Sequence, residues 1–253
     1  MTTLRDIAVR VLLDLLSAFA LLSRLPLPDH KASGAASAWA WPLVGAVLGA
    51  MAAGVASAAL MLGVTPGVAA ALVLATLALL TGGLHEDGLA DTADGLFGGW
   101  TKQRRLEIMK DSRIGSYGML ALMLVTLARW SALTALLVFG GHWAALIATG
   151  TVSRAPMALM MALLPNARGE GLSHATGRPS QAVAWVGLTL ALAISLGLGG
   201  WTGFALPGVA LLAAVLVSIS ALRRIGGQTG DILGATQQLA EVACLALLSA
   251  RAG

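Results

Sequence analysis

Charged residues are scarce in this chain. Of its 253 residues, 11% are charged and 57% are hydrophobic, whereas soluble domains carry about 25% charged residues. The mean hydropathy is +0.83, and several apolar runs reach the roughly 20 residues that a helix needs to cross a bilayer. The composition excludes a soluble globular protein and predicts an all-α, polytopic transmembrane bundle in contact with the lipid bilayer.

Aromatic residues and cysteine are also rare. Aromatics make up 5% of the chain, too few for the base-stacking platforms of single-strand nucleic-acid binding. The net charge of +4 is typical of the basic cytoplasmic loops of membrane proteins, so we expect no nucleic-acid partner. Cys244 is the single cysteine and lies in an apolar stretch, which excludes an internal disulfide and a cysteine-rich metal site.

The apolar runs predict about seven spans within a single catalytic membrane domain, residues 1–253. We place the spans at 39–63, 66–84, 117–139, 142–164, 181–199, 203–222 and 236–250. Gly45 and Gly49 form a small-residue face in the first span, where a neighbouring helix can approach closely. No internal repeat is visible, which argues against an inverted-repeat transporter.

The N-terminal segment carries charges at helical spacing. Asp6, Arg10 and Asp14 share one face of a helix, opposite Leu12 and Phe19. This pattern favours an amphipathic helix lying at the membrane surface, with a membrane-crossing helix as the alternative.

The connections between spans alternate in length and charge. The short connections, which carry no Lys or Arg, are 64–65, 140–141 and 200–202. The long connections, which carry Lys and Arg, are 24–38, 85–116, 165–180 and 223–235. The positive-inside rule places the long loops in the cytoplasm. We therefore expect a multi-pass protein of the cell inner membrane whose active site faces the cytoplasm.

Half of the twelve acidic residues lie between Glu86 and Asp111. Asp87, Asp91 and Asp94 are spaced i, i+4, i+7, which aligns their carboxylates on one helix face. Unpaired carboxylates at one site repel each other, and a divalent cation removes that repulsion. Oxygen ligands suit Mg²⁺ or Mn²⁺ better than zinc. We predict a metal site at these three aspartates, with a solvated acidic turn as the alternative.

Glycines flank this acidic segment at positions 82, 83, 88 and 95. Glycine lowers helix stability, and the sequence offers no packing reason for these four. We interpret them as places where a ligand approaches the backbone.

Three polar loops accompany the acidic segment. Residues 110–118 are basic and broken by glycine, which suits a diphosphate substrate. Residues 226–234 are glycine-rich and suit backbone nests for anions, although they lack the Lys-Ser/Thr ending of a Walker A loop. Residues 168–178 form a candidate substrate lid.

Together these motifs resemble the cobalamin synthase family (adenosylcobinamide-GDP ribazoletransferase). The resemblance rests on residues 83–95 (GLHEDGLADTADG) and 108–118 (IMKDSRIGSYG), with support from residues 25–28, 153–154 and 229–231. It spans nearly the whole chain, and the two long motifs together are highly specific. Glu86 is the one position of the acidic motif that the resemblance leaves without a role.

The resemblance implies a reaction. A ribose hydroxyl of α-ribazole, or of its 5′-phosphate, attacks the phosphate joined to cobinamide in adenosylcobinamide-GDP, and GMP leaves. In such a phosphoryl-type transfer, metal ions and positioning supply most of the catalysis. Asp87, Asp91 and Asp94 would hold Mg²⁺, with Mn²⁺ as an alternative. Asp111 or Asp231 would orient or deprotonate the hydroxyl.

The same resemblance suggests the other site residues. Lys110 and Arg113 join the catalytic group, where they would neutralise phosphate charge. The substrate-binding candidates are His85, Arg129, Ser153, Arg154, Thr229 and Gly230. A homodimer is the default assembly.

Arg129 and Arg154 lie deep inside the predicted spans. Each is about 12 residues from the start of its span, or about 18 Å, in a hydrocarbon core about 30 Å thick. A charge at that depth needs an anion or water. Glu241 is the acid in the spans that can pair with one of them, which would form an arginine–glutamate clamp. We favour a water-filled cavity descending from Asp87, with Arg154 reaching toward a phosphate.

Two other functions remain as alternatives. The acidic motif resembles more loosely that of the CDP-alcohol phosphotransferases, whose aspartate spacing is not matched here. A cation-coupled transporter also uses carboxylates and glycine-broken helices, but its site lies near the bilayer midplane. The aspartates of this chain lie at the end of a span.

Overall fold

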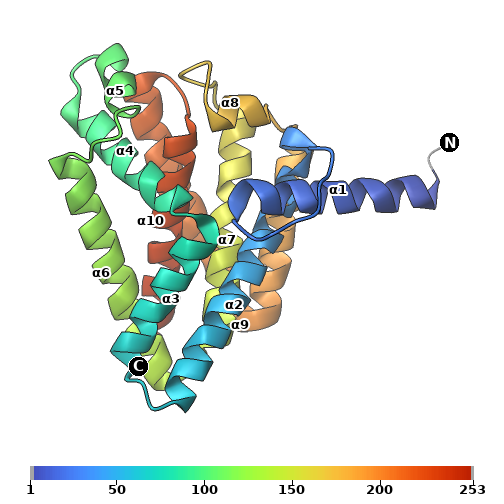
Figure 1. The fold of residues 1–253 in the computed structure, drawn as a ribbon, viewed down its shortest axis with the longest axis vertical. Coiled ribbons are helices and arrows are strands. Elements are labelled where there is room, and N and C mark those ends of the chain that lie inside the picture. Colours follow the sequence, from blue (N-terminus) through green and yellow to red (C-terminus); the bar gives the residue numbers. More distant parts are fainter. Residues whose placement is uncertain (1–2, 252–253) are drawn as a thin grey trace.

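A computed structural model describes residues 3–251, and helices account for the regular structure of that part of the chain. The helices are α1 (Leu4–Leu22), the 3₁₀ helix η1 (Gly34–Ala40), α2 (Trp41–Met61), α3 (Pro66–Thr81), α4 (Leu84–Gly98), α5 (Lys102–Ile108), α6 (Ser116–Phe139), α7 (His142–Leu163), α8 (Leu172–Thr176), α9 (Gln181–Ile225) and α10 (Gly230–Ser249). The long helices stand side by side as a bundle, and the short α5 and α8 lie together at one end of it (Figure 1).

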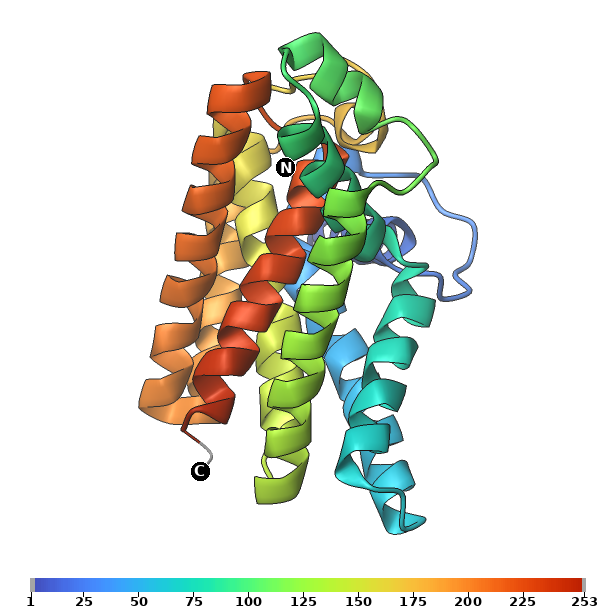
Figure 2. The same ribbon diagram turned by 90° about the vertical axis from the view of Figure 1, so that its left-hand side faces the viewer.

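Long apolar helices make up the bundle. Within the described residues, five helices are long and apolar enough to cross a membrane, and the pair α3–α4 adds a sixth if it is counted as one bent span. Gly200 interrupts α9 with a non-helical φ of 52°, and Gly203 packs against the carbonyl of Ser195 across this break. The two halves of α9 are therefore antiparallel neighbours (Figure 2). Counting them separately gives seven apolar segments, as the sequence predicts.

The small-residue face of α2 packs against α7. A Cβ atom on Gly45 would collide with the carbonyl of Gly150, and one on Gly49 would collide with the carbonyl of Leu146. Backbones can come this close only where side chains are absent. The prediction of a close helix–helix contact at Gly45 and Gly49 is confirmed.

A sharp bend separates α4 from the spanning helix α3. The two helices meet at 90°, and both residues of the turn, Gly82 and Gly83, have left-handed φ values of 67° and 70°. Glycine adopts this conformation at low cost. We count α3 as the membrane-spanning member of the pair. Helix α4 turns away from it and packs against α6 and α10, and α5 follows it at that end of the bundle (Figure 2).

The flanking glycines have structural roles that the sequence did not reveal. Gly82 and Gly83 make the bend. A Cβ atom on Gly88 would lie 2.9 Å from the carbonyl oxygen of Asp231, so α4 and α10 touch at this point. Gly95 packs in the same way against Met109. The interpretation of these glycines as ligand-approach positions is therefore wrong, because each has a packing or turn role.

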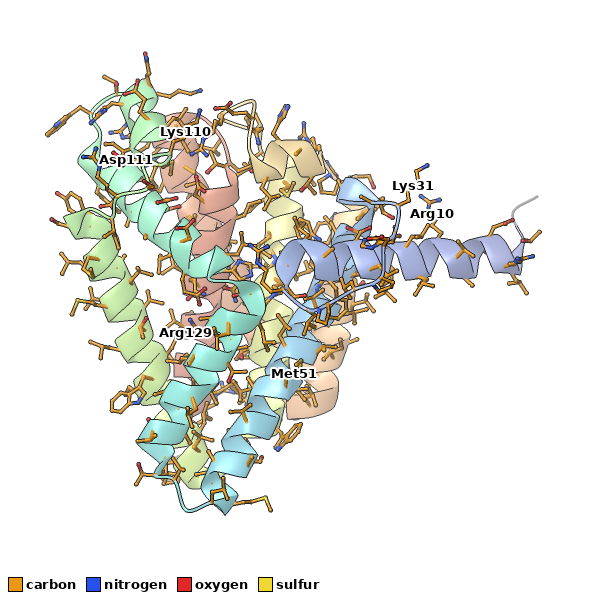
Figure 3. All side chains as sticks on the ribbon, in the orientation of Figure 1. Arg10, Lys31, Met51, Lys110, Asp111 and Arg129 are labelled. Atoms are coloured by element: carbon orange, nitrogen blue, oxygen red, sulfur yellow. The ribbon has the colours of Figure 1, made fainter. Side chains whose placement is uncertain are left out.

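Helix α1 lies across the bundle rather than along it (Figure 1). Its first turn is closed by a capping box between Thr3 and Asp6. Asp14 is buried and accepts a hydrogen bond from Trp39 Nε1 at 3.0 Å, which ties α1 to η1. Arg10 and Lys31 lie on the side of α1 that points away from the spans (Figure 3). This orientation agrees with the predicted surface helix and not with a crossing one.

The last helix begins earlier than predicted. Helix α10 starts at Gly230, because the Thr229 side chain accepts a hydrogen bond from the amide of Ile232 at 3.3 Å and caps it. Asp231 in the first turn adds favourable charge at this end. The predicted polar loop 223–235 is thereby reduced to residues 226–229, and two of its four glycines, Gly230 and Gly234, are helical.

Candidate active site

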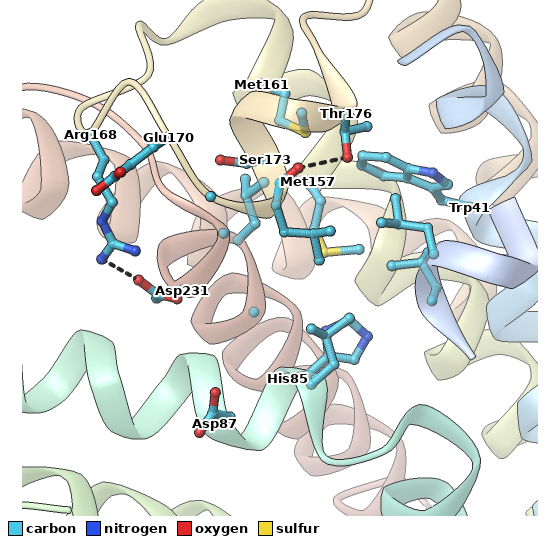
Figure 4. Close-up of a pocket in the computed structure, with 18 residues that line it drawn as sticks. Trp41, His85, Asp87, Met157, Met161, Arg168, Glu170, Ser173, Thr176 and Asp231 are labelled. Atoms are coloured by element: carbon cyan, nitrogen blue, oxygen red, sulfur yellow. Dashed lines mark hydrogen bonds and ion pairs between the residues drawn. The ribbon is translucent and has the colours of Figure 1, made fainter. Parts of the chain in front are cut away.

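The predicted acidic segment borders a cavity at the end of the bundle that carries α5 and α8. The cavity has a volume of about 110 Å³ and lies between α4, α10, α7, the N-terminal end of α2, the C-terminal end of α1 and the α8 loop (Figure 4). Its polar lining residues are His85, Asp87, Arg168, Glu170, Ser173, Thr176 and Asp231. Its large apolar lining residues are Leu21, Leu22, Trp41, Leu84, Met157, Met161, Leu172 and Leu233.

Asp87 and Asp91 lie one turn apart on α4. Asp87 is exposed and lines the cavity, and Asp91 is half-buried behind it. Burial, together with the nearby charges of Asp87, Asp231 and Asp94, raises the pKa of Asp91 to about 7. The carboxylates are therefore close enough to repel one another, as the helical spacing predicts.

Asp94 has a structural role as well. Its Oδ2 accepts a hydrogen bond from the amide of Gly115 at 2.7 Å, and its Oδ1 accepts one from the amide of Gly118 at 2.9 Å. These amides belong to the N-terminus of α6, where the helix leaves its first N–H groups unpaired and favours negative charge. Asp94 thus joins α4 to α6.

Asp231 faces α4 from the first turn of α10. Its Oδ2 accepts hydrogen bonds from Arg168 Nη2 at 2.8 Å and from Thr229 Oγ1 at 3.3 Å. Both bonds fall on one oxygen, and the carboxylate lies beside Asp87 in the cavity wall (Figure 4). Of the two predicted base candidates, Asp231 lines the cavity and Asp111 does not.

The α8 loop is held in place by its own hydrogen bonds. Asn166 accepts hydrogen bonds from the amides of Arg168 and Gly169, at 3.1 and 2.8 Å, and donates one to Ser173 Oγ at 3.0 Å. A backbone hydrogen bond of 2.8 Å joins Ala167 to Gln228 in the loop before α10. These hydrogen bonds order the candidate lid as one side of the cavity and position Arg168 to bind Asp231.

Lys110 and Asp111 lie at the end of the bundle that carries α5 (Figure 3), and neither they nor Arg113 line the cavity. Lys110 pairs with Glu170, a cavity-lining residue. Arg113 Nη2 pairs with Asp111 Oδ2 at 2.7 Å on the surface, and the hydrogen bonds from Arg113 lower the pKa of Asp111 to about 2. Asp111 and Arg113 therefore form an ion pair with each other, and neither lines the cavity that Asp87 and Asp231 border.

A buried polar network lies beneath α4. Arg129 Nη2 donates to Glu241 Oε1 at 2.6 Å, and Arg129 Nη1 donates to Gln238 at 2.8 Å and to Glu86 at 3.3 Å. Gln238 Nε2 also donates to Glu86, at 3.0 Å. Glu86, which the sequence left without a role, therefore fastens α4 to α6 and α10.

The two deep arginines differ in their partners. Arg129 pairs with Glu241 and so forms the arginine–glutamate clamp, the alternative that the sequence favoured less. Arg154 is 2% exposed and donates to the carbonyl of Gly150 at 3.0 Å on its own helix. Ser153 accepts from Gln237 in the same layer, at 3.1 Å. Neither Arg154 nor Ser153 lines the cavity, so the predicted cavity does not descend to Arg154.

Of the remaining predicted substrate-binding residues, two line the cavity and one lies behind the lining residues. His85 and Gly230 line the cavity, and His85 is buried at 3% exposure. Thr229 is buried at the cap of α10 and supports the wall from behind.

The carboxylates fit a metal ion that the substrate helps to hold. Among residues 3–251, no three His, Cys, Asp or Glu side chains surround a common position at ligand distance. A preformed site with three aspartate ligands is therefore not present in this geometry. Mg²⁺, however, is usually held by one or two carboxylates together with substrate phosphates and water. Asp87 and Asp91, which repel each other without a cation, meet that requirement.

Comparison with known proteins identifies the family. The family model described as cobalamin-5-phosphate synthase matches residues 14–249. The chain belongs to this family. Its relatives include adenosylcobinamide-GDP ribazoletransferases from Bradyrhizobium diazoefficiens (45% identical, covering 95% of this chain and 94% of the relative) and Azorhizobium caulinodans (44%, covering 93% and 95%). No solved structure gives a significant match.

Membership of the cobalamin-5-phosphate synthase family makes the protein a transferase of cobalamin synthesis and confirms the resemblance seen in the sequence. Sequence reasoning placed Arg168, Glu170 and Ser173 in a candidate substrate lid because their loop is polar, but it did not name them as site residues. Trp41 and Met157 carried no such signal, because apolar residues in spans are mostly packing residues.

Proposed function

We propose that this enzyme joins α-ribazole, or its 5′-phosphate, to adenosylcobinamide-GDP and releases GMP. The observation that carries the proposal is the pairing of the acidic face of α4 with Asp231 and Arg168 across one cavity (Figure 4). The names of the relatives supply the substrates, and the cavity supplies the groups that such a transfer needs.

Each group has a proposed task. Asp87 and Asp91 would hold Mg²⁺, which would neutralise the diphosphate oxygens. Asp231 would accept the proton of the attacking ribose hydroxyl, since its Oδ2 is fixed by Arg168 and Thr229 while Oδ1 accepts no bond from either. The hydroxyl oxygen bonds to the phosphorus next to cobinamide. The bond from that phosphorus to the oxygen of GMP breaks, and GMP leaves with the electron pair.

Supporting residues would position these groups. Arg168, with Lys110 paired to Glu170 behind it, would supply positive charge beside the diphosphate. Asp94 and Glu86 would hold α4 against α6 and α10 through the hydrogen bonds described above. We further propose that the enzyme lies in the cell inner membrane with this cavity facing the cytoplasm, because the basic loops gather at this end.

The test is release of GMP by the purified full-length protein. With both substrates and Mg²⁺, we expect equimolar GMP and nucleotide-loop product by chromatography. Asp91→Asn should lower kcat at least 100-fold while leaving the unfolding temperature unchanged, because the half-buried carboxylate supports the metal rather than the fold. Asp29→Asn, at an exposed position outside the cavity lining, serves as the control. Near-normal turnover of Asp91→Asn at limiting Mg²⁺ would contradict the proposed metal site.

A further inference from the structure

Helix α1 extends sideways beyond the rest of the bundle (Figure 1). From Leu13 to Leu22 it packs against η1 and α2, and all but one of these residues are buried or half-buried. Every residue from Leu4 to Leu12 is exposed. This part of the helix, which we call the overhang, is about 13 Å long at 1.5 Å per residue. Its surroundings are therefore supplied from outside the bundle.

The overhang continues an apolar face that the bundle has already begun to cover. Leu15 packs against the hydrophobic core, and Val11, Ala8 and Leu4 precede it at helical spacing on the same face. Leu4 and Val11 are 87% and 39% exposed. Arg10 lies on the other side of the helix and points away from the spans (Figure 3). The bare apolar face is therefore turned toward the membrane that surrounds the spanning helices.

Three cations border a hollow on the polar side of the overhang. Arg5 and Arg10 come from α1 and Lys31 from the loop that follows it, and the hollow has a volume of about 430 Å³. All three cations are exposed, and none forms an ion pair with another residue in the described range 3–251. The amide of Ser33 donates to Ser17 Oγ at 2.9 Å, which fastens the loop, and with it Lys31, beside α1.

Two carboxylates line the same hollow, and both are engaged elsewhere. Asp6 Oδ2 accepts hydrogen bonds from the amide and the hydroxyl of Thr3, at 2.8 and 2.7 Å. Asp14 Oδ2 accepts one from Trp39 Nε1 at 3.0 Å. Three cations against two carboxylates leave a net charge of +1 in the hollow. That charge complements a single phosphodiester, the anionic group of a phospholipid.

We infer that the overhang of α1 is a binding site for anionic glycerophospholipids. The apolar face at Leu4, Ala8 and Val11 enters the boundary between headgroups and acyl chains, as the faces of interfacial helices do. Phosphates of the surrounding lipids then lie beside the helix, within reach of the long Arg10 and Lys31 side chains. A zwitterionic headgroup brings its own ammonium, which these cations repel, so phosphatidylglycerol is preferred over phosphatidylcholine. This inference concerns the membrane surface and does not depend on the proposed reaction.

The test measures which lipids contact the overhang. The full-length protein in a Cys244→Ala background carries a fluorophore attached through Ala8→Cys, in phosphatidylcholine nanodiscs. A small, fixed fraction of the lipid is either phosphatidylglycerol or phosphatidylcholine with a nitroxide on its acyl chain, which quenches the fluorophore on contact. Both lipids should quench. The phosphatidylglycerol should be enriched at least about fivefold over the phosphatidylcholine, because each basic residue near the surface contributes about 1 kcal/mol.

Matched variants assign the preference to the cations. Arg10→Gln combined with Lys31→Gln should bring the enrichment close to 1. Arg104→Gln combined with Arg223→Gln removes two exposed cations outside the hollow and should leave the enrichment unchanged. Raising the salt from 0.1 to 1 M should lower the enrichment in the parent protein, because the Debye length falls from about 10 to about 3 Å.

Three results would overturn the inference. Absence of quenching by either lipid would show that the overhang lies outside the bilayer, and energy transfer between labels on two copies would then assign its apolar face to a second copy of the chain. Equal quenching by the two lipids in the parent would remove the headgroup preference. A preference that survives the loss of Arg10 and Lys31 would place it elsewhere. If that double variant does not fold, the lipid comparison and the salt series in the parent decide alone.

Discussion

Replacing Arg129 should destabilise the bundle more than replacing any other membrane-embedded cation. Arg129 is shared by Glu241, Gln238 and Glu86 at 2.6, 2.8 and 3.3 Å, and the side chains of Arg129 and Glu241 are 4% and 5% exposed. Removing one partner of such a pair costs about 3–5 kcal/mol, because the other charge stays buried. At roughly 2–4 °C per kcal/mol, Arg129→Met should lower Tm by roughly 6–20 °C.

Arg154 supplies the matched control. It is equally buried, but its guanidinium bonds to the carbonyl of Gly150 and lies within ion-pair distance of no described carboxylate. Arg154→Met should therefore cost at most about 1.5 kcal/mol, the value of one hydrogen bond. Thermal unfolding in detergent, followed by circular dichroism, measures both variants, and Glu241→Gln should resemble Arg129→Met. Equal destabilisation by the two arginine variants, or a neutral Glu241→Gln, would refute the clamp.

Two further outcomes follow from the packing and the orientation of the bundle. Gly88→Ala should lower the free energy of unfolding by about 1–3 kcal/mol and reduce activity, because its Cβ would lie 2.9 Å from the α10 backbone. Gly197→Ala is the control and should change neither quantity, because no atom lies near its Cβ position. An unaffected Gly88→Ala enzyme would show that α4 and α10 are not in contact. The orientation can be tested in a Cys244→Ala background by placing single cysteines at two exposed positions. A cysteine at Gln103 should react with an impermeant thiol reagent only from the cytoplasmic side, and a cysteine at Leu62 only from the outside. Labelling of both cysteines from the same side would disprove the orientation.

Much of the architecture could be predicted from the chain alone. Seven apolar segments, the surface helix and the contact face at Gly45 and Gly49 all depend on local composition and helical spacing. The acidic face of α4 was predictable for the same reason, since Asp87 and Asp91 are one turn apart in any helix. Family membership rests on motifs that are contiguous in the sequence.

Only the tertiary structure decided which of these groups meet. Asp94 bonds to amides more than 20 residues later in the chain, Glu86 joins Arg129, and Arg168 reaches Asp231 from another loop. Trp41 and His85 line one cavity although 44 residues separate them. Helical periodicity determines which face of a helix a residue occupies, but it carries no information about which remote helix will cover that face. That choice depends on the close packing of small residues and on the pairing of buried charges throughout the bundle.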